Sequence, residues 1–401
     1  MNTRPVIDES AGPVALSASF NNDASCFAVG LDSGFCVFNT DPCELKVSRG
    51  ADFNAGIGKA EMLQRYNYLA LVGGGKSPKW AQTNVIIWDD AKQKASLTLP
   101  LMTAVLRVRM TKSRIVIALQ NSIHLYKFSQ PPEKTAVFET ADNPLGLCCL
   151  GTSLAAFPGR SPGKAQLVEL ESGNVSIIPA HASALRGIEL SRDGRYLATA
   201  SETGTLIRVF STANCAKIAE LRRGVDPAFI FSIAISPDST MLAVTSDKST
   251  LHVFDLPQQQ NPHHHHADIR RRSQSPHITT TSAADEEPSS NQKWGFLSKI
   301  PLLPRVFSDI YSFASTHFEM GDESVQGSSL SYLPALGSQP NRPQKGILGW
   351  IDNSTLICIG TGRDGRWERF RIGERPGGGG IDDHGGQRTI WRDGWKRYLG
   401  S

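Results

Sequence analysis

A repeat with an offset of about 45 residues constrains the fold of this chain more than any other feature. The stretch IELSRDGRYLATASETGTLIRVFSTANCAKIAEL (188–221) aligns almost residue for residue with IAISPDSTMLAVTSDKSTLHVFDL (233–256). Each copy contains an apolar strand, a polar turn, a second strand, another turn and a third strand. This period and this pattern are typical of the four-stranded blades of a β-propeller.

Weaker copies of the same unit fill most of the remaining chain and bring the count to seven. An isolated blade would expose apolar sheet faces and unpaired edge strands, so the units must stack around a closed ring. We therefore predict an all-β fold, a single seven-bladed β-propeller of the WD type, over residues 14–372 of the 401-residue chain.

Two segments depart from the repeat. Residues 257–316 interrupt the sixth unit after its third strand, and they greatly exceed an ordinary loop in length. The first half of this insertion is polar and of low complexity, which predicts disorder, whereas the second half is apolar. The glycine-rich tail, 373–401, is also expected to be disordered.

The charge balance suggests a partner only in broad terms. A net charge of +4 permits binding to an anionic surface but is smaller than nucleic-acid binders usually carry. No run reaches the roughly 18 apolar residues that a spanning helix needs. We expect a cytoplasmic protein, monomeric in solution, that does not bind nucleic acid.

Two adjacent arginines stand at the end of the fifth unit, in the sequence Leu221-Arg222-Arg223-Gly224. Neighbouring side chains on a strand point to opposite faces, so the two arginines are placed to serve two separate sites. Guanidinium groups match the geometry of phosphate oxygens, and a glycine lets the backbone approach a ligand closely. The motif therefore indicates phosphate recognition.

On this motif the chain resembles the PROPPIN family, seven-bladed propellers that bind polyphosphoinositides and act in autophagy and vacuolar membrane traffic. The stretch GGGKSPKW…NVIIWDD (73–90) is similar to the branch of the shorter WIPI proteins and the fungal swollen-vacuole homologues. The resemblance implies a peripheral membrane adaptor that binds phosphatidylinositol 3-phosphate and 3,5-bisphosphate on vacuole, endosome and autophagic membranes. It implies neither a cofactor nor a metal.

The resemblance also implies two lipid-binding pockets beside the arginine pair. The first pocket comprises His181, Ser201, Thr203, Thr205, Arg208 and Arg222. The second comprises Arg223, Ser246, Lys248, Thr250 and His252. Taken singly, a histidine or serine in a blade more often joins strands together, but its grouping with arginine favours ligand binding. The family usually has glycine where this chain has Ser249.

The apolar half of the insertion predicts contact with a bilayer, which matches the membrane-inserting loop of the family's sixth blade. The residues expected to insert are Trp294, Phe296, Leu297, Ile300, Leu302, Leu303 and Phe307. Burial of one large apolar side chain contributes about 1.5–3 kcal/mol, so several together could hold a protein at the interface. After Pro304, apolar spacing at Phe307, Ile310, Tyr311 and Ala314 predicts a short helix. The alternative is a satellite helix packed on the propeller.

Other signals are weaker. The stretch 73–77 (GGGKS) lacks the first glycine of a nucleotide-binding loop and is followed by Pro78. By resemblance, Lys76, Pro78, Lys79 and Trp80 form a contact for a large autophagy lipid-transfer protein. The histidine run 263–266 lies in low-complexity sequence, where we expect no metal site.

Two interpretations of function remain open. The first is the phosphoinositide-binding adaptor. The second is a soluble WD-type scaffold that binds only proteins, in which the arginine pair would make structural ion pairs. We do not expect an enzyme, because the sequence contains no hydrolase elbow or zinc-protease motif.

Overall fold

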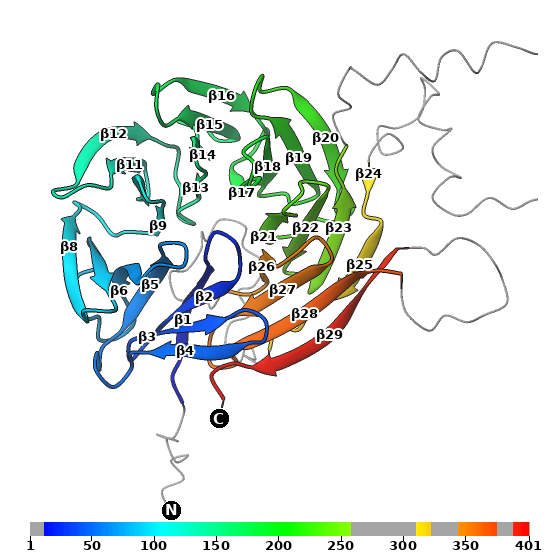
Figure 1. Cartoon of the computed structure of the whole chain (residues 1–401). Coiled ribbons are helices and arrows are strands. Elements are labelled where there is room, and N and C mark those ends of the chain that lie inside the picture. The colour runs from blue at the N-terminus through cyan, green and yellow to red at the C-terminus, as the bar shows by residue number, and fades with distance from the viewer. Residues whose placement is uncertain (1–11, 258–309, 322–343, 375–387, 401) are drawn as a thin grey trace, which may run out of the picture.

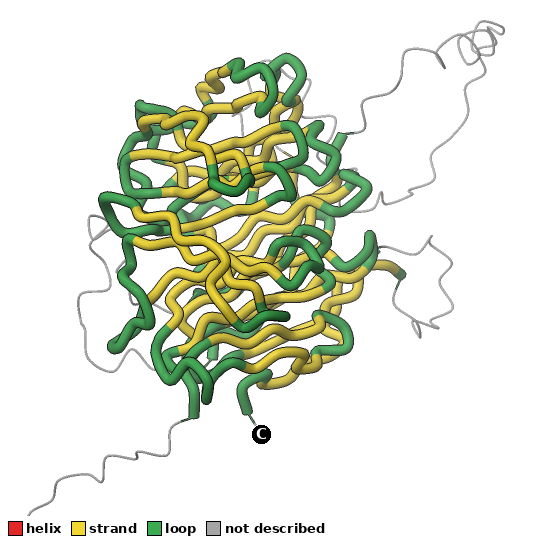
Figure 2. The backbone as a smooth tube through the Cα atoms, turned by 60° about the vertical axis from the view of Figure 1, so that its left-hand side comes forward, coloured by secondary structure: helices red, strands yellow, loops and turns green. Residues whose placement is uncertain are grey.

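Seven antiparallel sheets form a ring around a central axis in a computed structural model that describes residues 12–257, 310–321, 344–374 and 388–400 (Figure 1). The predicted seven-bladed β-propeller is thereby confirmed. The described residues consist of strands, turns and loops, as Figure 2 shows, and no helix among them could span a membrane.

The first four blades follow one another along the chain. Blade one contains β1 (Ala15–Phe20), β2 (Cys26–Leu31), β3 (Phe35–Asn39) and β4 (Glu44–Ser48). Blade two contains β5 (Ile57–Met62), β6 (Tyr68–Gly73), β7 (Asn84–Asp89) and β8 (Lys94–Pro100). Blade three contains β9 (Arg107–Met110), β10 (Arg114–Ala118), β11 (Ser122–Lys127) and β12 (Glu133–Glu139). Blade four contains β13 (Cys149–Leu150), β14 (Leu154–Pro158), β15 (Lys164–Glu169) and β16 (Val175–Pro179).

The last three blades include the segments around the insertion and the tail. Blade five contains β17 (Leu185–Leu190), β18 (Tyr196–Ser201), β19 (Leu206–Ser211), β20 (Lys217–Arg222) and the short β24 (Ile310–Tyr311). Blade six contains β21 (Ile230–Ile235), β22 (Met241–Ser246), β23 (Thr250–Asp255) and β25 (Ala314–His317). Blade seven contains β26 (Ile347–Trp350), β27 (Thr355–Gly360), β28 (Arg366–Gly373) and β29 (Thr389–Arg397).

The core lies between neighbouring blades. The second strands are buried along their whole length in blades one, five, six and seven, because both faces of each strand are covered by adjacent sheets. The outer strands β4, β8 and β12 are largely exposed. In Figure 1 the first strand of each blade lies nearest the axis and the fourth lies at the rim.

The ring closes between blades seven and one through side chains and a short backbone bridge. Ala15 and Gly362 exchange backbone hydrogen bonds of 3.1 and 2.9 Å. The indole nitrogen of Trp367 donates a 2.9 Å hydrogen bond to the carbonyl oxygen of Thr40. The Tyr398 ring packs against Phe27 in a buried cluster that both blades share.

The structure corrects the expected helix after Pro304. Residues 310–311 and 314–317 are strands β24 and β25, and the amide of Phe313 between them donates to the carbonyl of Val253. β24 pairs with the rim strand of blade five, and β25 supplies the fourth strand of blade six. Pairing with these open sheet edges satisfies the backbone N–H and C=O groups of both segments. The local spacing of apolar residues carries no information about these distant edges, so it favoured a helix.

The expected disorder of the tail is wrong for residues 388–400. β29 pairs with β28 over its full length and completes blade seven, with Ile390 and Tyr398 buried. Without β29 the blade would lack its rim strand, so burial and pairing outweigh the glycine-rich composition that predicted disorder. The propeller therefore extends beyond the predicted boundary at residue 372, while residues 375–387 lie outside the described part.

Substitution of Tyr398 tests whether the end of the chain belongs to the core. Its ring is 7% exposed, and its hydroxyl donates a 2.9 Å hydrogen bond to the carbonyl of Gly360. We expect Tyr398→Ala to lower the free energy of unfolding by about 3–5 kcal/mol and Tyr398→Phe by about 1 kcal/mol, measured by urea denaturation. The exposed Lys396→Ala should change it by less than about 0.5 kcal/mol. Equal effects of Tyr398→Ala and Lys396→Ala would contradict this packing.

Candidate functional site

The arginine pair lies where blade five ends and the chain crosses to blade six. Leu221 is fully buried, Arg222 is the last residue of β20, and Arg223 is the first residue of the connection to β21. The backbone amide of Arg223 donates a 2.9 Å hydrogen bond to the carbonyl of Thr205. The backbone of the motif is therefore fixed by its own blade.

The Arg223 guanidinium is held by carbonyl groups. Its Nε donates a 2.8 Å hydrogen bond to the carbonyl of Gly204, and Nη2 donates to the carbonyl of Asp226. Among the described residues it forms no ion pair with a carboxylate, although the charges of Asp247 and Asp226 are near enough to favour its charged form. Burial lowers the Arg223 pKa. The side chain is 8% exposed, so its orientation is set by the protein before any ligand binds.

Part of the predicted first pocket gathers at the β18–β19 turn beside the pair. The hydroxyls of Ser201 and Thr203 are 2.9 Å apart; Ser201 is buried and Thr203 is exposed. Leu206 lies opposite Arg222 in the β19–β20 ladder, which places the half-buried Thr205 next to the pair. This turn brings three of the predicted hydroxyl-bearing residues to the arginine motif.

His181 and Arg208 lie farther from the arginine pair, and both already contact other groups of the protein. Arg208 forms a 2.8 Å ion pair with Glu220, which lies opposite it on β20, and donates a 2.6 Å hydrogen bond to the carbonyl of Ala180. A ring nitrogen of His181 is 3.0 Å from the hydroxyl of Thr199. Burial, helped by the charge of Arg208, lowers the His181 pKa to about 4, so the imidazole is neutral at pH 7.

The predicted second pocket occupies the corresponding turn of blade six. The hydroxyls of Ser246 and Thr250 are 3.3 Å apart, and the amide of Lys248 donates to the Ser246 oxygen at 3.4 Å. Ser249 has φ of +56°, a left-handed conformation that favours glycine. A glycine would adopt this conformation without strain, and here it is occupied by serine.

His252 connects this turn to the returning end of the insertion. Its Nδ1 is 3.2 Å from the hydroxyl of Ser312, between β24 and β25. Burial lowers its pKa to about 4, and the positive charge of Arg223 adds to the effect. His252 belongs to β23, so this electrostatic influence links the arginine motif to blade six.

The chain returns from the insertion directly beside the arginine pair. β24 runs parallel to β20, with Tyr311 opposite Arg222, and continues into β25 (Figure 1). The side chains of Ile310 and Tyr311 are 40% and 52% exposed. The seven residues expected to insert into a membrane, from Trp294 to Phe307, lie outside the described residues.

Sequence reasoning missed Gly204, Asp226 and Ser312, which position the predicted residues. Gly204 has φ of +61°, and its carbonyl accepts the hydrogen bond from Arg223. The only available signal was the turn sequence Ser-Glu-Thr-Gly-Thr around it. Ser312 gave no signal, because its contact with His252 depends on strand pairing across 60 residues of sequence.

The second-blade loop combines exposed and packed residues. Lys76 and Pro78 are exposed, whereas Trp80 packs against Phe53, with ring centroids 5.7 Å apart. The ammonium group of Lys79 donates a 3.2 Å hydrogen bond to the carbonyl of Phe53. A protein contact at this loop stays a prediction.

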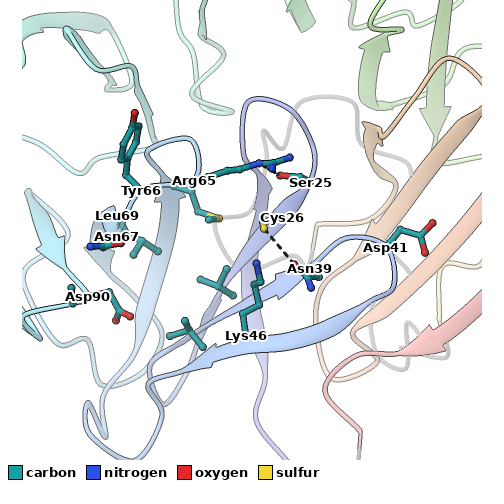
Figure 3. A pocket seen from close by; sticks show the side chains of 14 residues that line it. Ser25, Cys26, Asn39, Asp41, Lys46, Arg65, Tyr66, Asn67, Leu69 and Asp90 are labelled. Atoms are coloured by element: carbon teal, nitrogen blue, oxygen red, sulfur yellow. Dashed lines mark hydrogen bonds between the residues drawn. The ribbon is translucent and has the colours of Figure 1, made fainter.

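A cavity of about 450 Å³ opens between blades one and two (Figure 3). Its polar lining includes Lys46, Arg65 and Asp90. Arg65 is paired with Asp23 at 2.8 Å, and Asp90 with Arg49 at 2.9 Å. The cavity contains none of the predicted site residues.

Comparison with known proteins gives consistent matches. The profile of the family described as PROPPIN matches residues 15–269. SVP1-like protein 2 of Emericella nidulans is 57% identical over 340 residues, covering 85% of this chain and 99% of that protein. SVP1-like protein 2 of Neurospora crassa is 48% identical over 431 residues, covering 100% and 99%.

Solved structures agree in fold. Kluyveromyces lactis Hsv2 superposes with a TM-score of 0.69 at 24% identity, covering 96% of this chain and 99% of that chain. A complex of KlAtg21 with the coiled coil of AgAtg16 gives a TM-score of 0.62 at 17% identity, with the same coverage. At these identities the likeness concerns the propeller fold.

Substitution of Gly204 tests how closely its turn packs against the connection that follows Arg223. A Cβ at Gly204 would lie 1.8 Å from the carbonyl oxygen of Ala228, whereas one at Gly173, also at positive φ, would meet nothing within 4 Å. We expect Gly173→Ala to lower the free energy of unfolding by about 1 kcal/mol and Gly204→Ala by about 3 kcal/mol, measured by urea denaturation. Equal losses would contradict the close packing of this turn.

Proposed function

The chain belongs to the PROPPIN family of phosphoinositide-binding propellers, and we propose that it is a peripheral membrane adaptor for phosphatidylinositol 3-phosphate and 3,5-bisphosphate. In this proposal Arg222 serves a pocket on blade five and Arg223 serves a pocket towards blade six. The adaptor would act on vacuole, endosome and autophagic membranes and bring protein partners to them.

The observation that carries the proposal is the position of the arginine pair between two similar hydroxyl-bearing turns. Ser201 and Thr203 stand on the blade-five side, and Ser246 and Thr250 stand on the blade-six side. Arginine supplies charge-assisted hydrogen bonds to phosphate, while hydroxyls supply neutral ones. The two turns occupy equivalent positions of the repeat, so each can offer the same kind of hydrogen bonds to a phosphate group.

The histidines suit an anionic ligand in their neutral state. His181 and His252 are uncharged at pH 7 because burial and a nearby arginine lower their pKa values to about 4. A neutral imidazole can still donate one hydrogen bond from its N–H. A bound phosphate would offset the arginine charge and so raise the pKa values of both histidines. Protonated histidines would in turn attract the phosphate more strongly.

The described geometry also supports a role for the insertion at the bilayer. The chain re-enters the propeller at Ile310, beside Arg222, with two exposed apolar side chains on β24. The end of the insertion is thus attached where headgroups would bind. We propose that its apolar segment, which includes Trp294 and Phe296, enters the bilayer beside the bound headgroups.

Liposome flotation tests this proposal. We expect the wild-type protein to float with liposomes that carry either phosphoinositide and to remain unbound with liposomes that carry neither. Arg222→Thr/Arg223→Thr should reduce the floated fraction at least about tenfold, because each lost guanidinium removes charge-assisted bonds to phosphate. Trp294→Ser/Phe296→Ser should reduce flotation but leave binding of the soluble headgroup unchanged.

The control is Arg195→Thr, which removes an exposed arginine paired with Asp193 on the same blade. It should float like the wild type, and all variants should show the wild-type circular dichroism spectrum. Equal flotation of wild type and the double arginine variant would contradict the proposal. If no folded protein floats with phosphoinositide, the soluble protein scaffold becomes the better interpretation.

A further inference from the structure

Two cations on the inner strands of blades two and three form no ion pair with the carboxylates that the structure describes. They are Lys59 on β5 and Arg107 on β9. Within the described residues, neither forms an ion pair, although both are only partly exposed. This arrangement is unusual, because partly buried charges in proteins are normally paired.

The ladder registers place Lys59 and Arg107 at the same level of the ring. Two residues farther along each strand, Glu61 of β5 and Arg109 of β9 form a 2.7 Å ion pair between the blades. Lys59 and Arg107 each lie two residues, about 7 Å, before this ion pair on their strands. In Figure 1 both strands lie at the inner side of their blades.

In the described part of the chain, Glu61 and Glu189 are the carboxylates whose charges act on Arg107. The carboxylate of Glu61 is already used by Arg109. Glu189, on the inner strand of blade five, has its pKa raised to about 7 by burial, although the charges of Arg109 and Arg107 oppose this rise. Burial and the charge of Arg107 lower the Lys59 pKa to about 8. An added anion would relieve the repulsion between the two cations.

A buried hydroxyl of blade one stands at the corresponding level. Ser17 is the first paired residue after a register shift in β1, where it lies opposite Gly30. Lys59 has the same position in β5, where it lies opposite Val72. Ser17 is 5% exposed, and its hydroxyl has no hydrogen-bond partner in the described part of the chain. The equivalent position of blade one thus carries no charge, and the two cations at this level belong to blades two and three.

We propose that Lys59 and Arg107 bind a small soluble anion that carries two or more phosphate groups, on the axial side of blades two and three. The ammonium group offers three donors and the guanidinium a planar fork, a combination suited to adjacent phosphates. This site lies on different blades from the rim arginines, and it does not depend on the proposed lipid binding.

Isothermal titration with tripolyphosphate at low salt tests the site. The protein carries Arg222→Thr/Arg223→Thr throughout, so that the rim pair cannot account for binding. We expect this protein to bind, and the addition of Lys59→Gln/Arg107→Gln to weaken binding at least about tenfold through loss of charge-assisted bonds. Lys46→Gln/Lys94→Gln is the matched control, since it removes two exposed cations of outer strands. It should bind within about twofold of the background protein.

A second measurement leaves the inner strands unchanged and so does not depend on the folding of a variant there. In the same background, tripolyphosphate should protect Lys59 from acetylation at least about fivefold, read by mass spectrometry, and should leave Lys94 unprotected. Absence of binding, equal binding by the Lys59→Gln/Arg107→Gln protein, equal weakening in the control, or equal protection of both lysines would each overturn the proposal.

Discussion

The architecture depends on one constraint: each blade has two apolar faces, and only the neighbouring blades can cover them. The fully buried strands β2, β18, β22 and β27 show this most directly, since no face of them is left for water. Closure between Trp367 and Thr40 is therefore as necessary as pairing within a blade. It also fixes the geometry between blades, on which any site shared by two blades depends.

The arginine motif uses this fixed geometry. Arg223 is oriented by the carbonyls of Gly204 and Asp226, which leaves its positive charge without a carboxylate partner among the described residues. Arg208, by contrast, is neutralised by Glu220, whose pKa falls to about 2 despite burial because Lys217 and Arg208 donate hydrogen bonds to it. Of the predicted first-pocket residues, Arg208 is thus better suited to positioning the strands than to holding a ligand charge.

The repeat made the propeller predictable, because a period of about 45 residues and three recognisable strands per unit leave few other folds. The strands that were missed, β24, β25 and β29, all lie at the rims of blades five, six and seven. Their pairing depends on partners distant in sequence, as between Tyr311 and Arg222, so local spacing gave no signal. The turns around Ser201 and Ser246 were predictable because the repeat duplicates them. The level shared by Lys59 and Arg107 required the strand registers of two blades.

In the proposed mode of binding one arginine serves each of two pockets, and titration with the soluble headgroup inositol 1,3-bisphosphate counts the occupied pockets. We expect two bound headgroups per wild-type chain, and one for Arg222→Thr or Arg223→Thr alone. On membranes, either single variant should lose far more apparent affinity than its remaining pocket loses for the soluble headgroup, because simultaneous engagement is abolished. A single bound headgroup in the wild type, or two in either variant, would contradict the claim.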